Sequence, residues 1–351
     1  MNKLSEKLKT IKKINLILRT LSTEYVKELF VTLTEKSDDR FTLKGLSEKE
    51  RFADGRYCPK CGGKHIVRNG HRKDGTQRYV CRCCGVSFVA TSNTVIAGTH
   101  KELDTWKKYI ECMLNGVSVR KAADICGIHR NTAFSWRHKI LETLVDMESG
   151  VLLDGIVEAD DTFFPLSFKG NHKYSKQFVM PREAYHRGRH IKKVGTSNDL
   201  VCVPCAVNRK GLSVARAGKL GMTSTLCIEV TIGGNIKDNS VLCTDKCPSY
   251  NRFAYAHNLT LIQIKGGRVK DGIYHIQHVN GYHSRMKSFM YNFGGVSTKY
   301  LNNYLAWNNF VNYSPEVFKE KKRLLLKQIV TDFVGYTCRR LSYRPAIPTL
   351  V

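Results

Sequence analysis

The chain has 351 residues, 42% of them hydrophobic and 10% aromatic, which excludes a disordered chain and predicts two or three domains with packed cores. Lys and Arg number 57 against 30 Asp and Glu, a formal net charge of +27 that is spread along the whole chain. A positive field of this size attracts polyanions and gains affinity by releasing their counterions, so we expect a nucleic-acid partner. A ribosome-bound or merely basic protein and a protein on an acidic membrane surface are the alternatives.

No apolar run approaches the roughly 20 residues that a helix needs to span a bilayer. The basic N-terminus lacks the apolar core and cleavage site of a signal peptide, so we expect no membrane partner. The 13 cysteines are an odd number in a chain without an export signal. This favours a cytoplasmic protein in which some cysteines bind metal and others are simply buried.

Composition divides the chain into five regions. Residues 1–52 are basic with apolar residues at helical spacing, residues 53–93 are rich in Cys, Gly, Arg and Lys, and residues 100–146 return to a helical pattern. Residues 150–315 show strands first, then alternating strands and helices, then helices, which predicts an α/β domain with a mixed sheet. Residues 316–351 form a basic tail.

Two Cys-X-X-Cys pairs lie in the second region. They are Cys58 with Cys61 and Cys81 with Cys84, and 19 residues separate the pairs. Each pair places two thiolates on one side of a tight loop, so the four complete a tetrahedral Zn²⁺ site and predict a zinc ribbon. We expect Cys83 to be a bystander. Disulfides or a redox pair are the alternative, which a reducing compartment disfavours.

The segment between the two pairs is basic. We expect it to turn through Arg68-Asn69-Gly70 and form a hairpin. Its cations, among them Arg68 and Arg72, suit contacts with DNA phosphates, and protein–protein contact is the alternative.

Residues 117–140 have the pattern of a helix-turn-helix. A helix from Val119 to Cys126 is expected to break at Gly127-Ile128, and a second to run from His129 to Lys139. The side chains expected to face inward are Ala122, Ala123, Ile125, Ile128, Ala133 and Trp136. Those left for DNA are Arg130, Asn131, Arg137 and Lys139. A small helical bundle without DNA contacts is the alternative.

Within 150–315 the expected elements alternate. GIVEADDTFF reads as a buried strand, and the segments on either side of an Arg209-Lys-Gly turn as a hairpin. A helical piece, the strand SVLCTD, a helix over SYNRFAYAHN and the strand LTLIQI follow. Two helices, roughly 279–292 and 298–312, close the domain.

Carboxylates occur on two of these strands. Glu158, Asp160 and Asp161 lie on the first, and Asp245 ends the strand SVLCTD. Charges in a buried strand are costly unless they are paired or bound to metal. Carboxylates at the ends of neighbouring strands are what a Mg²⁺ site requires, and two such ions can activate a nucleophile and stabilise a leaving oxygen. A capping role is the alternative for a single Asp.

The helix that begins near Val279 carries a polar face. Asn280, His283, Lys287 and Tyr291 recur on it at spacings of three and four. An oxygen ligand, an imidazole and a cation on one face favour a catalytic interpretation together with the two strands. Helix capping by Asn280 and a phosphate contact by Lys287 are the alternative.

With these motifs the sequence resembles DDE-type insertion-sequence transposases of the bacterial branch with an N-terminal zinc ribbon, a helix-turn-helix and an Asp-Asp-Asn-Lys signature, the ISXO2-like transposase domain. The resemblance covers roughly residues 55–312. It rests on YCPKCGGKHIVRNG, RYVCRCCGVSF, GIVEADDTFFPLSFKG, VLCTDKCPSY and HVNGYHSRMKSFMYNFGGVSTKYLNNYLAW, of which the last is the most specific.

This resemblance implies a ribonuclease-H-like catalytic fold that cleaves double-stranded DNA at transposon ends and joins it to target DNA, with Mg²⁺ or Mn²⁺ and as a homodimer on DNA. By position, Asp160 and Asp245 are the metal-binding carboxylates. Asn280 stands where the wider superfamily has Glu, and Lys287 follows seven residues later. The residues expected to grip DNA in the insert after the first Asp are Arg182, Arg187, Arg189 and Lys192.

Asn280 is the departure from the wider pattern. An amide is a weaker Mg²⁺ ligand than a carboxylate, so either one ion is held less tightly or Glu158, Asp161 or His283 assists. The alternatives to an active enzyme are an inactive, domesticated DNA-binding regulator and a zinc-ribbon nucleic-acid-binding factor.

Overall fold

The computed structural model describes residues 43–171, 179–181, 197–264, 270–331, 340–341 and 343–345. The chain divides into two compact units, Met1–Ala90 with His100–Trp106 and Thr91–Thr99 with Lys107–Val351. The helical region expected over 1–52 lies outside the described residues except for α3 (Leu43–Arg51). Within the described ranges, no helix is long and apolar enough to cross a membrane.

The first unit contains a three-stranded antiparallel sheet of β1 (Ile66–His71), β2 (Gln77–Cys81) and β3 (Ser87–Val89). Helix α3 is tied to this sheet. The Ser47 hydroxyl donates to the carbonyl of Ala90 at 3.1 Å, and the Tyr79 hydroxyl donates to Glu48. Phe52, just after α3, meets the Tyr79 ring edge to face at 5.2 Å. These contacts give the small sheet a core that its own strands are too short to supply.

The hairpin between β1 and β2 turns later than expected. Arg68 and Gly70 lie within β1, where the register shifts between Arg68 and His71 and Gly70 has φ 63°. The turn is at 72–76, where Asp74 accepts from Thr76 N at 3.1 Å and Gly75 has φ 74°. The expected turn was wrong because Asp-Gly forms the turn, whereas Asn-Gly produces an irregularity inside the strand.

The helical part of the second unit includes α5 (Val119–Cys126), with the bounds expected from the sequence, and α6 (Arg130–Ser149), which is longer than expected. Ser118 caps α5 by accepting from Lys121 N, and Gly127 ends it with φ 58°. Tyr109, on α4 (Leu103–Leu114), packs edge to face on Trp136 at 5.4 Å. Ile125, expected to face inward, is 51% exposed.

Arg137 lies in the core rather than on the DNA-facing surface where it was expected. It is 1% exposed, its guanidinium lies 4.9 Å from the Trp307 ring centroid, and Nη2 donates to Val117 O at 2.5 Å. The expectation was wrong because Trp307, on α10 (Leu301–Tyr313), covers this position from a distant part of the chain. The region expected to be a basic tail contains α11 (Phe318–Thr331), which buries Leu325 and Ile329 and contacts α6.

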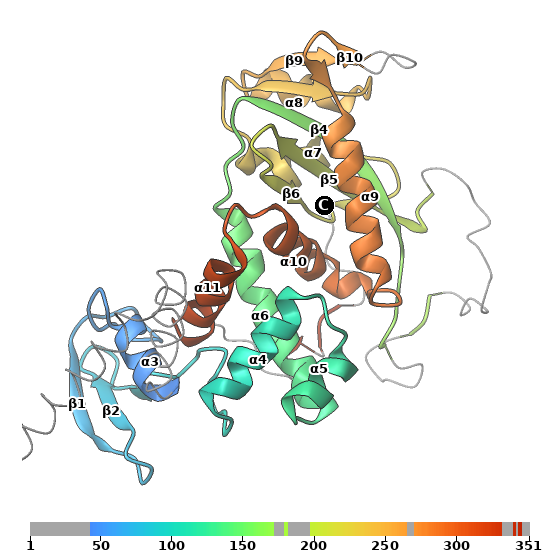
Figure 1. The fold of residues 1–351 in the computed structure, drawn as a ribbon. Helices are drawn as coiled ribbons and strands as arrows, with labels where there is room; N and C mark the ends of the chain where they lie inside the picture. Colours follow the sequence, from blue (N-terminus) through green and yellow to red (C-terminus); the bar gives the residue numbers. More distant parts are fainter. Residues whose placement is uncertain are drawn as a thin grey trace, which may run out of the picture. The chain divides into compact units, whose positions relative to one another are not determined.

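The α/β part of the second unit has the expected mixed sheet, in the order β6-β5-β4-β8-β9. Strands β4, β5, β6 and β9 are labelled in Figure 1. The central strand β4 (Ile156–Pro165) is antiparallel to β5 (Leu200–Asn208), which is antiparallel to β6 (Ser213–Ala215) and also pairs with β7 (Lys219–Leu220). On its other side, β4 is parallel to β8 (Val241–Thr244), and β8 is parallel to β9 (Thr260–Gln263).

The two faces of β4 have different roles. Val157 and Ala159 lie in an apolar core with α7 (Thr225–Ile232) and α8 (Ser249–Ala256). Because side chains alternate along a strand, Glu158 and Asp160 point to the opposite face. There β4 and β5 contact α9 (Gln277–Tyr291), which runs beside β4 in Figure 1. The remaining short elements are η1 (Gly233–Asn235), β10 (Lys270–Asp271), β11 (Tyr274–His275) and η2 (Thr298–Tyr300).

Candidate functional site

Three aspartates lie near one another where β4 and β8 run side by side. They interact electrostatically, but among the described residues they do not form one of the groups whose ligand atoms all lie within 4.8 Å of one another. In the parallel pairing Glu158 lies opposite Cys243, and Asp160 and Asp245 each follow two residues later. The two carboxylates therefore leave neighbouring strands at the same edge of the sheet. Asp161 is the next residue of β4, and its backbone N–H donates to Asp160 Oδ1 at 2.9 Å. Asp245 Oδ1 accepts from Cys247 N at 3.0 Å, which fixes its side chain just beyond β8.

The electrostatics of this cluster disfavour three charged carboxylates. Burial, and then the charge of Asp245, raises the pKa of Asp160 to about 6 against the lowering effects of the Asp161 amide and Lys287. Burial also raises the pKa of Asp161 to about 7, and both other aspartates add to this, although the Tyr250 hydroxyl donates to Asp161 at 3.1 Å. Like charges that repel one another in a low dielectric raise each other's pKa, and such perturbed groups are common at functional sites.

Helix α9 brings His283 and Lys287 to Asp160. His283 Nδ1 lies 3.9 Å from Asp160 Oδ2, and Lys287 acts electrostatically on both side chains. Burial, and then the charge of Lys287, lowers the pKa of His283 to about 4, so its imidazole is neutral at neutral pH. Its buried Nε2 has no hydrogen-bond partner among the described residues. Asn280 is exposed one turn earlier on the same face of α9.

Glu158 has a different role from the aspartates. Its Oε2 accepts the backbone N–H groups of His278 at 2.7 Å and Val279 at 3.1 Å, in the first turn of α9. A carboxylate at this position satisfies free amides and favours the positive end of the helix dipole. Glu158 thus anchors α9 to β4, two residues before Asp160.

The side chains of Glu158, His275 and His278 are close enough together to hold a metal ion. Arg209 already lies among them. Its Nη1 is 3.1 Å from Glu158 Oε1, 2.7 Å from His275 Nε2 and 2.8 Å from His278 Nδ1. Because a guanidinium lies where a cation would bind, this cluster is a structural ion pair rather than a metal site. No sequence pattern singled out Arg209, His275 and His278 as partners of Glu158, since only the fold brings them to it.

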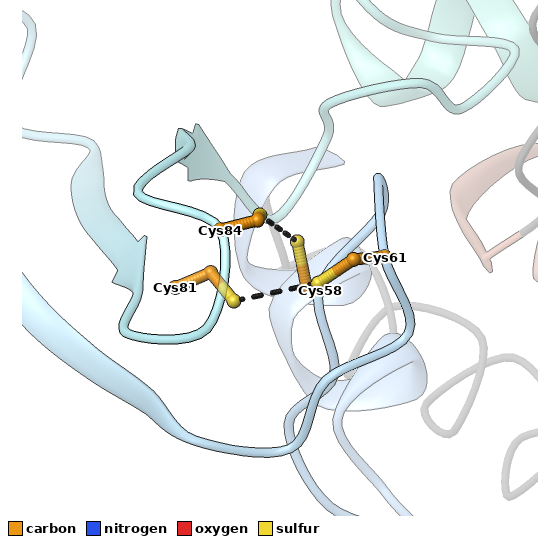
Figure 2. Close-up of side chains that lie close together, drawn as sticks. All are labelled: Cys58, Cys61, Cys81 and Cys84. Atoms are coloured by element: carbon orange, nitrogen blue, oxygen red, sulfur yellow. Dashed lines mark hydrogen bonds between the residues drawn. The ribbon is translucent and has the colours of Figure 1, made fainter.

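The four cysteines of the first unit converge as expected (Figure 2). Cys58 and Cys84 have their Sγ atoms 3.6 Å apart, as do Cys61 and Cys81. Tetrahedral Zn²⁺ with Zn–S bonds of about 2.3 Å requires S···S distances of about 3.8 Å, so the spacing fits.

The two loops that carry these sulfurs are alike. Gly62 N donates to Cys58 O at 3.0 Å, and Gly85 N donates to Cys81 O at 2.9 Å. Both glycines have positive φ, 71° and 72°. Burial raises the pKa of the Cys81 thiol, but the backbone amides of Cys84 and Cys83 and hydrogen bonds with the Cys61 and Cys84 side chains together lower the pKa to about 6, which favours a thiolate. Cys83 itself is exposed and outside the group of four.

Residues 152–310 match the family model described as the ISXO2-like transposase domain. This segment is an ISXO2-like transposase domain. It contains β4, β8 and α9, and with them the three aspartates, His283 and Lys287. The family resemblance inferred from the sequence is confirmed over this range.

Two solved structures show a weaker similarity. A chain of the simian T-cell lymphotropic virus intasome, in complex with PP2A regulatory subunit B56 gamma, is 9% identical, with 60% of this chain and 70% of that chain covered and a TM-score of 0.29. A chain of the pre-cleavage Mos1 transpososome is 10% identical, with 64% and 79% covered and a TM-score of 0.21. These TM-scores are too low to establish a common fold.

The residues expected to contact DNA lie mostly outside the transposase domain. Arg68 and Arg72 are exposed on the hairpin of the first unit. In the helical part, Arg130 and Asn131 are exposed in the first turn of α6, and Lys139 is half-buried. The four cations expected to grip DNA from the insert after Asp160 all lie outside the described residues: Arg182, Arg187, Arg189 and Lys192.

Proposed function

We propose that this protein is a transposase that binds the terminal inverted repeats of its insertion sequence, cleaves the DNA at the ends and joins them to target DNA. The observation that carries the proposal is the cluster of Asp160, Asp161 and Asp245 beside His283 and Lys287, inside a transposase domain. The strand order supports a ribonuclease-H-like fold: β4, the first strand of this sheet, is central, with the antiparallel pair β5 and β6 on one side and the parallel strand β8 on the other.

The donor set fits Mg²⁺ or Mn²⁺. Carboxylate oxygens of Asp160 and Asp245 are hard ligands of the kind these ions prefer. The raised pKa of Asp160, and the Nε2 of His283 that has no partner among the described residues, support a site whose charge and hydrogen bonding are incomplete without a cation. Bound there, divalent ions supply a polarised nucleophile and stabilise the charge on the phosphate and the leaving oxygen.

The side chains around the aspartates orient the substrate. Lys287 is exposed on α9 and places a positive charge beside Asp160, where it can hold a DNA phosphate. Asn280, exposed on the same face, offers an amide oxygen and a donor toward the same DNA strand. Glu158 keeps α9 in place, so we assign it a positioning role and leave assistance with the metal to Asp161 or His283.

DNA binding is assigned to three regions. Arg130, Asn131 and Lys139 contact DNA from α6 as the second helix of a helix-turn-helix, and Arg68 and Arg72 contact phosphates from the zinc ribbon. Arg187 and Arg189 add contacts from the insert of the transposase domain. Cys58, Cys61, Cys81 and Cys84 hold a structural Zn²⁺. We propose that the enzyme acts as a homodimer on double-stranded DNA in the bacterial cytoplasm.

The test is cleavage of DNA that carries the inverted repeats flanking the gene. Wild-type protein should nick these repeats in Mg²⁺ or Mn²⁺ and not in EDTA. Asp160→Ala and Asp245→Ala should abolish nicking, and the matched control Asp238→Ala, an exposed aspartate outside the cluster, should not. Nicking by both cluster variants would refute the assignment. Specific binding without cleavage in any divalent metal would indicate a DNA-binding regulator instead.

A further inference from the structure

A second site lies in the helical part of the second unit, away from the aspartates. A cavity of about 1010 Å³ is bounded by the start of α5, by α6, by η2 and by residues 343–345. It is at the upper end of the size range of ligand pockets. The described residues that line it include none of the aspartates, His283 or Lys287.

The wall of this cavity is strongly basic. Five cationic side chains line it: Arg120, Arg137, Lys169, Lys299 and Arg344. No acidic side chain lines it among the residues that the structure describes. Arg344 pairs with Glu142 at 2.5 Å behind the wall. Lys169 donates to the carbonyls of Gly294 and Gly295 and Lys299 to Asn171, all at 2.9 Å, so their charges are not neutralised by these partners.

Burial, and then the positive charges of Arg137, Arg344 and Lys299, lowers the pKa of His138 to about 3. Burial is the larger cause, and the three cations add to it, as expected beside a wall whose described charged side chains are all cationic. The cavity is therefore an electrostatic site for an anion rather than for a cation.

Buried polar atoms at the wall lack partners. Arg137 and His138 are each 1% exposed, and Arg137 Nε and His138 Nδ1 have no hydrogen-bond partner within the described part of the chain. Nδ2 of Asn171, another residue that lines the cavity, is also buried without a hydrogen-bond partner among the described residues. Buried donors are nearly always satisfied in folded proteins, so this group indicates a ligand rich in acceptors, such as a phosphate or a base carbonyl.

The cavity also has an aromatic wall. The ring centroids of Phe134 and His138 are 4.3 Å apart, and those of His138 and Tyr300 are 4.0 Å apart. Phe134 is 43% exposed, so its ring remains open to a planar partner. Aromatic rings next to cations are the combination on which unpaired bases stack while their phosphates are held electrostatically.

We propose that this cavity binds a nucleotide whose base is not stacked in a duplex, with the base against Phe134 and the phosphate toward Arg120 and Lys299. The proposal rests on the proposed function only for the source of that nucleotide, an unpaired end or extruded base of the bound DNA. A free mononucleotide offers the same chemistry, and the experiment separates the two sources.

The test is equilibrium binding of the full-length protein to a blunt duplex and to the same duplex with a short single-stranded overhang, by fluorescence anisotropy. Wild-type protein should prefer the overhang. Phe134→Ala and Arg120→Gln should each weaken overhang binding by about fivefold or more while changing blunt-duplex binding by less than about twofold. Stacking of a base on one aromatic ring, and a charged hydrogen bond to a phosphate, are each worth at least that much. Tyr255→Ala, which removes an 89% exposed ring outside the cavity, is the matched control and should change neither.

Competition identifies the source. If unlabelled overhang displaces the probe and mononucleotide does not, the ligand is DNA; if mononucleotide displaces it equally well in wild type but not in Phe134→Ala, the ligand is a free nucleotide. Equal affinity for both probes in wild type, or overhang binding unchanged in both cavity variants, would overturn the proposal. The assay requires no cleavage, so Asp160→Ala protein should pass it, and its failure is distinct from failure of the proposed function.

Discussion

Glu158 accepts the backbone N–H of His278 at 2.7 Å, and this bond ties the first turn of α9 to β4 two residues before Asp160. The helix that carries Asn280, His283 and Lys287 is thereby positioned from the same strand that carries the first aspartate. Arg209 holds Glu158 from the side at 3.1 Å. The geometry of the aspartate cluster therefore depends on a carboxylate that does not belong to it.

Glu158→Gln should separate positioning from binding. The amide keeps one acceptor for α9 but loses the charge that pairs with Arg209, and charge-assisted hydrogen bonds contribute about 1.5–3 kcal/mol. We expect a lower melting temperature, metal-dependent cleavage reduced at least about tenfold, and unchanged repeat binding. Glu229→Gln is the control, because Glu229 also forms an ion pair, with His257 at 2.7 Å, but lies on α7 rather than at the start of α9. Wild-type cleavage rates in Glu158→Gln would argue against the anchoring role.

Glu148 should make stability depend on pH. Burial raises the pKa of this carboxyl from 4.5 to about 7, partly offset by the hydrogen bond from Asn309 and by Arg216. The folded state binds the proton of Glu148 more tightly than the unfolded state does. The stability gained from this proton is therefore complete below about pH 4.5 and is lost as pH rises through about 7. In wild-type protein this proton should make the free energy of unfolding fall by at most about 3 kcal/mol across this pH range, and Glu148→Gln should remove that fall. Urea denaturation of both proteins at several pH values measures it, and parallel curves would contradict the assignment.

The cysteines offer a matched pair. Cys61→Ser removes a sulfur of the converging group, whereas Cys83→Ser alters its exposed neighbour. We expect purified wild-type protein and Cys83→Ser to contain one equivalent of zinc, and Cys61→Ser to lose it together with the protease resistance of the first unit. Elemental analysis and limited proteolysis give the readouts. Zinc lost from Cys83→Ser but kept in Cys61→Ser would mean that the ligand set is different.

The two arginines of α6 should behave differently. Arg130 is exposed in the first turn, so Arg130→Ala should weaken repeat binding and leave the melting temperature nearly unchanged. Arg137 is buried over Trp307, and Arg137→Leu should cost about 2 kcal/mol of stability through the lost cation–π contact and hydrogen bond. Gel-shift and thermal-melt measurements on both variants test this. A stable Arg137→Leu protein that no longer binds DNA would restore the role expected from the sequence.

Local patterns predicted a large part of this molecule. The spacing of Cys58, Cys61, Cys81 and Cys84 was sufficient to predict the cluster, because each loop is local. The strand with Asp160, the α5 bounds and the mixed sheet followed from hydrophobic pattern and turn residues. The failures involve contacts between distant segments. Nothing near Arg137 in the sequence indicates that Trp307 covers it.

The contacts of Glu158 with Arg209 and with helix α9 could not be predicted from the sequence for the same reason. Glu158 lies on β4 and Arg209 directly follows the paired strand β5, while His278 lies on α9, 120 residues after Glu158, and only the fold brings the three together. The pattern that singled out Glu158, a charge in a buried strand, was correct as a signal. It could not distinguish a metal ligand from the anchor of a helix.

The most direct test of metal-dependent cleavage at this cluster is a change of metal specificity. Asp245→Cys exchanges a hard oxygen ligand for a softer sulfur, which disfavours Mg²⁺ more than Mn²⁺. Cleavage of the terminal repeat by wild-type protein should occur in either metal, whereas Asp245→Cys should cleave in Mn²⁺ and lose at least about tenfold in Mg²⁺. If Asp245→Cys cleaves as fast as wild type in Mg²⁺, then Asp245 does not hold the catalytic metal.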